Sequence, residues 1–382
     1  MNYATRVVAE PIAAPGELVR LYNSAPGNWI YPVPLRIGHY YLIAGIMKVF
    51  GASAEQAGVA LSTSCSIVQL VMVALFGLRF FDRWTALTAV ALLSVSPHDL
   101  AMARRVWGDG VSGCLAMVFF WLCAEIAVRP RARLLFLPLG ICAALFLLIK
   151  ETGGFFFGFC ILGLLIQSKR QNQHWTRAAW IVAGAGAAAV CSFAIMAWLC
   201  GGVPAAFETI RHNGESTPGN AYAVLYQNGP WYSFPLGLWI LSPLTAFGCV
   251  VGLIALILPG DSLGRVLQLT ETQRTMTWGL AGIILIVIVA ATLPPDLKNL
   301  RYISFIVGPW HLMAAVGLSY TLERIRNSLG SHAAVPVIGL AIVLVFFSCW
   351  ADYSRFRDIF VQRAVVDLDI RHMVTSPVSL SF

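Results

Sequence analysis

The chain has 382 residues, a formal net charge of +8 at pH 7, and a composition in which 58% of the residues are hydrophobic and 12% are charged. A soluble domain carries roughly 25% charged residues, so this composition excludes an ordinary soluble protein. The mean hydropathy of +0.74 indicates a polytopic membrane protein. In a membrane, the positive charge favours anionic lipid headgroups or phosphate ligands as partners. Nucleic acid is not expected, because no basic stretch is interleaved with aromatic residues.

The first 56 residues form a mixed segment that we place outside the membrane, at its surface. Residues 13–24 predict a short helix with Leu18, Val19, Leu21 and Tyr22 on one side. Residues 36–50 are apolar but number about 15, fewer than the roughly 20 that a span needs, so we expect a helix that lies in or dips into the interface. The first 15 residues hold no apolar core of a signal peptide.

Ten apolar segments follow and predict an all-α, polytopic transmembrane domain over residues 57–350 with about ten spans. They cover residues 57–81, 84–103, 109–128, 133–149, 152–167, 178–200, 233–258, 276–293, 302–322 and 335–350. A long loop, residues 201–230, separates the sixth and seventh segments, and residues 351–382 form a tail. The nine cysteines lie in or beside these apolar segments without a CxxC pair, so we expect packing side chains rather than a metal or redox site.

The distribution of cations predicts which connections face the cytoplasm. Compact connections with two or three cations alternate along the chain with connections of mixed charge, and we place the compact ones inside. The inner set comprises residues 79–83, 129–133, 169–177, 265–274 and 324–326. The outer set then holds the turns at residues 104–109 and 150–151, loop 201–230, residues 294–301 and the tail. Cations on the outer side indicate that an anionic ligand binds there.

The turn at residues 96–110 is the most polar stretch between two apolar segments. It contains His98, Asp99, Arg104, Arg105 and Asp109, and holding such charges in hydrocarbon costs several kcal/mol. Asp109 falls at the start of a predicted helix, where the free N–H groups and the helix dipole favour a carboxylate. Two interpretations stay open. The carboxylate either caps its helix beside interfacial arginines, or it belongs to a functional site.

Several stretches resemble the membrane glycosyltransferases of the C-type fold, in the branch of dolichyl-phosphate-mannose–protein mannosyltransferases and bacterial lipid A aminoarabinose transferases. The resemblance rests on residues 40–51, 77–83, 93–97 with Arg104 and Asp109, 148–153 ("LIKETG"), 228–232 and 299–302. These motifs follow the family's order from residue 1 to about residue 320. Each is weak alone, and together they favour this family.

The resemblance implies inverting transfer of a sugar from a polyprenyl phosphate to a lipid, glycan or protein acceptor on the outer face of a bacterial inner membrane. Asp109 matches the family's second-loop acid and is the catalytic candidate. Outer-face cations would hold the lipid phosphate, since guanidinium groups match phosphate oxygens. The donor-phosphate candidates are Arg104, Arg105, Lys150, Arg301 and Tyr302, and the acceptor or loop candidates are Glu151, His212 and Glu215.

Plainer interpretations stand beside these candidates. Lys150 and Glu151 could form an ion pair that caps a hairpin, and His212 and Glu215 could be solvated loop residues. A divalent metal is the one cofactor left open. His98, Asp99 and Asp109 are weak metal candidates, because their spacing fixes no ligand geometry.

The sequence departs from the family at its beginning. The principal catalytic Asp should follow the first transmembrane helix, and residues 1–6 resemble the run that comes just after that Asp. We therefore expect one helix and this Asp to be encoded upstream of Met1. The alternatives are a polytopic transporter or lipid flippase, or a catalytically degenerate relative if residue 1 is the true start. Charges cluster at helix ends and no internal repeat is visible, which disfavours the transporter.

Overall fold

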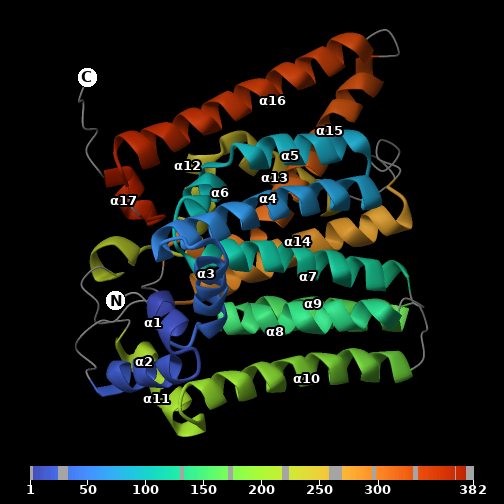
Figure 1. Ribbon diagram of the computed structural model, residues 1–382. Coiled ribbons are helices and arrows are strands. Elements are labelled where there is room, and N and C mark those ends of the chain that lie inside the picture. The colour runs from blue at the N-terminus through green and yellow to red at the C-terminus, as the bar shows by residue number, and fades with distance from the viewer. Residues whose placement is uncertain are drawn as a thin grey trace. The chain divides into compact units, whose positions relative to one another are not determined.

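The computed structural model describes residues 3–24, 33–129, 133–170, 175–216, 223–257, 269–294, 298–329, 334–365 and 367–375. These residues are almost entirely helical (Figure 1). Among them, the β-structure consists of an isolated antiparallel bridge between Asn299 and Asp369. The prediction of an all-α protein is therefore confirmed. The chain divides into two compact units, and each is described by itself below.

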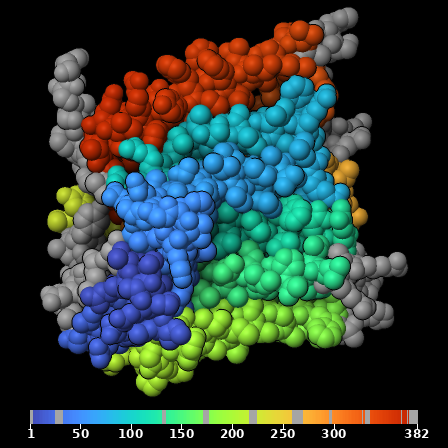
Figure 2. All heavy atoms as spheres, in the orientation of Figure 1, coloured from blue at the N-terminus to red at the C-terminus, as the bar shows by residue number. Residues whose placement is uncertain are grey.

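Unit 1 comprises residues 1–66 and 103–228 and begins with three short helices, α1 (Tyr3–Ala9), α2 (Ala13–Ser24) and α3 (Ile37–Phe50). These helices form part of the blue surface in Figure 2. The helix predicted at residues 13–24 is confirmed, with Leu18, Val19 and Tyr22 buried and Leu21 exposed. The C-terminus of α3 is capped by Gly51, whose φ of 65° is left-handed and whose N–H donates to Met47 O at 2.9 Å.

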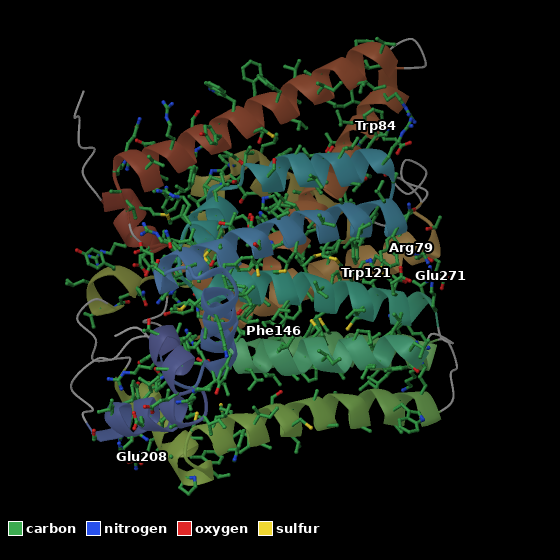
Figure 3. All side chains as sticks on the ribbon, in the orientation of Figure 1. Arg79, Trp84, Trp121, Phe146, Glu208 and Glu271 are labelled. Atoms are coloured by element: carbon green, nitrogen blue, oxygen red, sulfur yellow. The ribbon has the colours of Figure 1, made fainter. Side chains whose placement is uncertain are left out.

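The other helices of unit 1 differ in burial, from one that is mostly buried to one that is mostly exposed. They are the first part of α4 (Ala54–Phe80), then α7 (Gly108–Val128), η1 (Arg133–Leu135), α8 (Phe136–Ile149), α9 (Gly153–Arg170), α10 (Trp175–Leu199), α11 (Val203–Ser216) and η2 (Ala223–Gln227). Of the apolar stretch of α7, 78% is buried, against 17% for α10. Phe146 of α8, labelled in Figure 3, packs edge-on against Phe156 of α9 with ring centroids 5.9 Å apart. Helix α7 is therefore the core element of this unit.

Unit 2 comprises residues 67–102 and 229–382. Its helices are the second part of α4, then α5 (Arg83–Ser94), α6 (Pro97–Ala103), α12 (Ser233–Leu241), α13 (Pro243–Ile257), α14 (Glu271–Thr292), η3 (Leu300–Ile306), α15 (Val307–Leu329), α16 (Ala334–Phe356), η5 (Arg357–Gln362) and α17 (Ile370–Thr375). Helix α15 is central, since 83% of the apolar stretch that it forms with η3 is buried.

Glycine allows α13 and α15 to approach closely. A methyl group at Gly248 would lie 2.7 Å from Ala314 O, and one at Gly252 would lie 2.8 Å from Met313 O. A methyl group at Gly317 would lie 2.6 Å from Gly252 N. Small residues at such crossings let backbones come together where lipid provides no hydrophobic drive for helix association.

Six helices are long and apolar enough to cross a membrane, or seven if the bent pair α5–α6 counts as one span, within the residues that the structure describes. The six are α4, α7, α10, α14, η3–α15 and α16–η5, and shorter apolar helices are α3, α8 and α13. The chain is thus an integral membrane protein, as predicted. The expectation of about ten full spans is supported only in part, because some predicted segments are short or broken. Residues 233–258 divide at Ser242 before Pro243, and α5 bends by 57° into α6 before Pro97.

Candidate functional site

The loop before α7 is fixed by side chains of α4 and α3. Thr63 Oγ1 donates to Ala103 O at 3.0 Å, and Ser62 Oγ donates to Arg105 O at 2.6 Å. The Val106 side chain lies directly over Gly58, in space that any larger residue at 58 would fill. The His39 imidazole hydrogen-bonds to the backbone of Val106. This loop therefore enters α7 at a defined position, and Asp109 lies in the first turn of that helix.

Asp109 is paired with Lys150 in the interior of unit 1. Lys150 lies in the turn between α8 and α9, and its Nζ donates to Asp109 Oδ1. The side chains are 2% and 5% exposed for Lys150 and Asp109 respectively. Burial lowers the pKa of Lys150 from its usual range, and the neighbouring Asp109 carboxylate acts in the opposite direction. The structure thus brings together two residues that the sequence singled out separately.

A second ion pair lies at the same turn. Arg36, just before α3, contacts both carboxylate oxygens of Glu151, with Nη2–Oε1 at 2.8 Å and Nε–Oε2 at 3.2 Å. This is the bidentate geometry that guanidinium groups favour. Burial on its own raises the pKa of the Glu151 carboxyl, but the Arg36 charge and hydrogen bonds outweigh it and hold that pKa below its usual range. The Glu151 side chain is 43% exposed, so this pair lies at the edge of the cluster.

His39 contributes a buried imidazole beside these pairs. It is 4% exposed, and its Nδ1 has no hydrogen-bond partner among the described residues. Since Nδ1 is unpartnered, Nε2 is the atom that donates to Val106, which leaves Nδ1 as an acceptor. Burial lowers the pKa of His39 to about 4, so the ring is neutral at pH 7. The ring lies against Gly108, the residue before Asp109.

A glycine on α3 explains why this helix reaches the turn after α8. A methyl group at Gly38 would lie 3.0 Å from Leu148 Cβ and 3.1 Å from Ile149 Cγ1. Without a side chain there, α3 packs directly on the end of α8, one or two residues before Lys150. Arg36, His39, Asp109, Lys150 and Glu151 are named the polar cluster from here on. It holds two cations, two carboxylates and a neutral imidazole.

Arg104 and Arg105 lie on the loop that leads to Asp109. Arg104 is exposed, and Arg105 is half-buried with its guanidinium 6.0 Å from the Trp107 ring centroid. The loop carbonyls are held by Ser62 and Thr63, so the two side chains project from a fixed backbone. Their position on this loop is compatible with both the phosphate and the interfacial interpretation.

His212 and Glu215 lie on α11, within the predicted loop 201–230. Glu215 and Arg211 form a loose pair at 3.8 Å, and both side chains are 65% exposed. This exposure agrees with the solvated interpretation of the loop.

Arg301 and Tyr302 lie on η3 in unit 2. Arg301 Nη2 donates to Tyr302 Oη at 3.2 Å, and Arg301 Nη1 lies 3.3 Å from Asp367 Oδ2. The two predicted phosphate residues therefore contact each other. Arg301 is 7% exposed.

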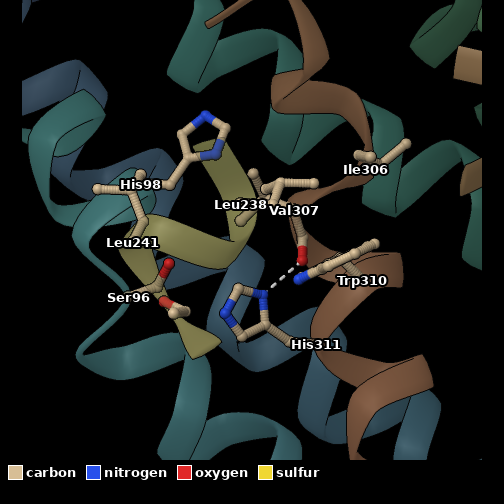
Figure 4. Close-up of a pocket in the computed structure, with 9 residues that line it drawn as sticks. Ser96, His98, Leu238, Leu241, Ile306, Val307, Trp310 and His311 are labelled. Atoms are coloured by element: carbon tan, nitrogen blue, oxygen red, sulfur yellow. Dashed lines mark hydrogen bonds between the residues drawn. The ribbon is translucent and has the colours of Figure 1, made fainter. Parts of the chain in front are cut away.

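His98 and Asp99 lie on α6, in the part of that helix that belongs to unit 2, and both are buried. His98 lines a cavity of about 10 Å³ together with Ser96, Ser242, Trp310 and His311 (Figure 4). Within this cavity wall, His311 Nδ1 donates to Val307 O at 2.7 Å. Among the described residues, no group of three or more His, Cys, Asp or Glu side chains is arranged to hold a metal ion. The metal hypothesis for His98, Asp99 and Asp109 gains no support from this geometry.

Sequence reasoning misses two residues of the polar cluster and the partner of Arg301. The sequence indicates Arg36 only as the start of an interfacial helix, and His39 as an ordinary helix residue. One pattern in the sequence does point to these two residues: a cation and a histidine stand three residues apart at the start of a short apolar helix. Asp367 lies in the tail, 66 residues after Arg301, and nothing in the local sequence pairs them.

Comparison with known proteins adds to this geometry. The family model described as dolichyl-phosphate-mannose-protein mannosyltransferase matches residues 33–198. This stretch is therefore similar to that family. It contains every residue of the polar cluster, and the match confirms the resemblance seen in the sequence. Arg301, Tyr302 and Asp367 lie outside the matched stretch.

The fold is similar to a solved structure, that of ArnT from Cupriavidus metallidurans in the apo state. The TM-score is 0.50 at 14% sequence identity, and the match covers 92% of this chain and 64% of the ArnT chain. The chain thus spans less than two thirds of that protein's length. At this identity the likeness concerns the fold alone. No curated protein matches the chain by sequence.

Proposed function

We propose that the chain is a glycosyltransferase that moves a sugar from a polyprenyl-phosphate carrier to an acceptor on the outer face of the membrane, in a bacterial inner membrane. One observation carries this proposal. Asp109 is buried and paired with Lys150 inside the stretch that matches the mannosyltransferase family model, next to further charged groups. Burying charges is costly unless they are paired, and a membrane protein gains little stability from such a cluster, so a chemical role accounts for it better.

The proposed roles follow from the chemistry of the transfer. The leaving group is already a phosphate, so the enzyme needs a base, cations for the phosphate and accurate placement more than it needs an acid. We assign Asp109 to the acceptor side as a carboxylate that receives a proton or orients the attacking group. We assign Lys150, the ion-pair partner of Asp109, to the donor phosphate.

Phosphate binding is assigned to several arginines. Arg104 and Arg105 lie on the loop that leads to Asp109, and Arg301 with Tyr302 provides a guanidinium and a hydroxyl. Arg36 joins this set as a guanidinium of the polar cluster. Glu151, with His212 and Glu215 on α11, is assigned to the acceptor. A sugar-bearing lipid phosphate, a lipid, glycan or protein acceptor, and the surrounding membrane lipids are then the partners.

The test is reconstitution of the protein, expressed from its complete reading frame and purified, in vesicles that contain a polyprenyl phosphate carrying a radiolabelled hexose, with membrane extract as the source of acceptor. We expect the label to enter the acceptor fraction while unsubstituted polyprenyl phosphate accumulates. Asp109→Asn should abolish both signals. Glu55→Gln, in the exposed first turn of α4, is the matched control and should leave them unchanged.

The alternatives give different outcomes in the same vesicles. A lipid flippase would move the intact donor between leaflets without releasing its sugar. A catalytically degenerate relative would bind the donor and neither release the sugar nor move the lipid. Either result would contradict the proposal.

A further inference from the structure

The C-terminal segment of unit 2 is joined to the stretch that carries Arg301. Asn299 and Asp369 form an antiparallel bridge, in which Leu300 N donates to Leu368 O at 3.1 Å. Asn299 Nδ2 also donates to Asp369 Oδ1 at 2.6 Å. Asn299, Leu368 and Asp369 are completely buried. Residues 367–369 therefore form a fixed part of the structure around Arg301.

The helix that follows these residues is also docked. Ile370, the first residue of α17, packs against Gly237 of α12, where an added methyl group would lie 2.8 Å from Ile370 Cγ1. Met373 N donates to Asp369 O at 3.0 Å, which continues the turn into α17. The backbone on both sides of Asp369 is thus held by separate contacts.

Asp367 is oriented by this arrangement. Its Oδ1 accepts from Leu368 N at 2.8 Å, which leaves Oδ2 to contact Arg301 Nη1 at 3.3 Å. On the other side of the guanidinium, Nη2 donates to Tyr302 Oη. The Arg301 and Asp367 side chains are 8% and 10% exposed, so solvent screens this pair little. The guanidinium is therefore held at both terminal nitrogens.

We propose that Asp367 is a positioning residue, which fixes the Arg301 guanidinium for contact with an anionic phosphate group. This inference rests on the function proposed above, and it gives the C-terminal segment 367–369 a role in phosphate binding by Arg301. A planar guanidinium recognises phosphate through the direction of its N–H groups, so a fixed orientation improves binding more than charge alone. The pairing also compensates a buried charge while no ligand is bound.

The test measures binding of a polyprenyl phosphate to the chain in nanodiscs. We expect Asp367→Asn, which keeps the shape and removes the charge, to weaken binding by about tenfold or more, because a hydrogen bond to a charged group is lost. Asp367→Glu should recover most of the affinity. Asp358→Asn is the matched control, since Asp358 pairs with Arg363 in the same part of the chain and should leave affinity unchanged. Unchanged or tighter binding by Asp367→Asn would overturn the inference, because it would mean that the carboxylate is neutral toward the ligand or competes with it.

A second measurement separates this inference from the proposed function. The rate at which an arginine-specific dicarbonyl modifies Arg301 is followed by mass spectrometry in the wild type and in Asp367→Asn. We expect faster modification in the variant, because the guanidinium is released. Equal rates would overturn the positioning role even if the wild type binds donor. If the wild type binds no polyprenyl phosphate while the rates differ, the proposed function fails and the pairing stands.

Discussion

Lys150 and Asp109 form an ion pair between residues 41 positions apart in the chain, and the interior of unit 1 hides both side chains almost completely. A buried ion pair adds little to the free energy of unfolding, because the desolvation of two charges offsets their attraction. The pair also fixes the end of α8 against the start of α7. A substitution at either residue therefore also changes the environment of the other.

We predict that Lys150→Met destabilises the chain by about 3–5 kcal/mol, the usual cost of leaving a buried charge without its partner. The buried group that loses its Lys150 partner is Asp109, which is 4% exposed. The midpoint of thermal unfolding in detergent, followed by tryptophan fluorescence, measures the loss.

The double variant Asp109→Asn/Lys150→Met is the control for this prediction. It removes both charges at similar side-chain volume, so most of the lost stability should return. Transfer activity should not return with it, since Asp109 carries a proposed chemical role. If the losses of stability in the two single variants simply add in the double variant, the two residues are not coupled.

The Arg36–Glu151 pair predicts a component of stability that depends on pH. The Glu151 pKa is lower in the folded chain than its unfolded value of about 4.3. The pair therefore stabilises the fold fully above that unfolded value and loses its effect as the pH falls through the folded pKa. Because the carboxylate is 43% exposed, the effect should be at most about 1 kcal/mol.

Unfolding midpoints of the wild type and of Glu151→Gln, recorded from pH 6 to pH 3, test this component. We expect Glu151→Gln to be the less stable at pH 6 and the two proteins to converge toward pH 3. A constant difference over this range would mean that Glu151 acts through its shape and not through its charge.

Much of the architecture follows from the sequence because long apolar stretches and helix-breaking residues are local features. The helices at residues 13–24 and 36–50, the turn at Lys150 and the position of Asp109 at a helix start are all predicted and present. Pro97 accompanies the bend between α5 and α6, as expected of a residue that breaks helices. Apolar length alone does not reveal that residues 233–258 form two short helices, although Pro243 is visible in the sequence.

The candidate site is harder to predict, since its contacts join distant segments. Glu151 pairs with Arg36 across 115 positions, a relationship that no spacing within a helix encodes. The approach of α3 to the turn depends on the absence of a side chain at Gly38, which becomes meaningful only once Leu148 is seen beside it. Charge type identifies Asp109 and Lys150 as candidates, whereas packing determines that they meet.

His39 offers a test of how the loop before α7 is held. We predict that His39→Leu destabilises the chain by about 1–3 kcal/mol, because the Val106 backbone loses the hydrogen bond from the buried His39 ring. His39→Gln, which keeps an N–H donor, should lose less. Thermal unfolding midpoints of the two variants measure the losses. If the Leu variant is as stable as the wild type, His39 does not help to position Asp109.

The crossing of α13 and α15 gives the last prediction, which concerns unit 2. Gly317 faces the backbone of Gly248 and Gly252 so closely that a methyl group would overlap Gly248 O. Since the obstacles are main-chain atoms, the two helices must separate to admit Ala, and we expect Gly317→Ala to cost about 1–3 kcal/mol or more.

Gly339→Ala on α16 is the matched control, because an added methyl group there would meet nothing within 4 Å. Ala is favoured over Gly inside a helix by about 0.5–1 kcal/mol, so this variant should be neutral or slightly more stable. Thermal unfolding of the two variants in the same detergent separates packing from helix propensity. Equal effects at both positions would show that the α13–α15 contact does not depend on the missing side chain.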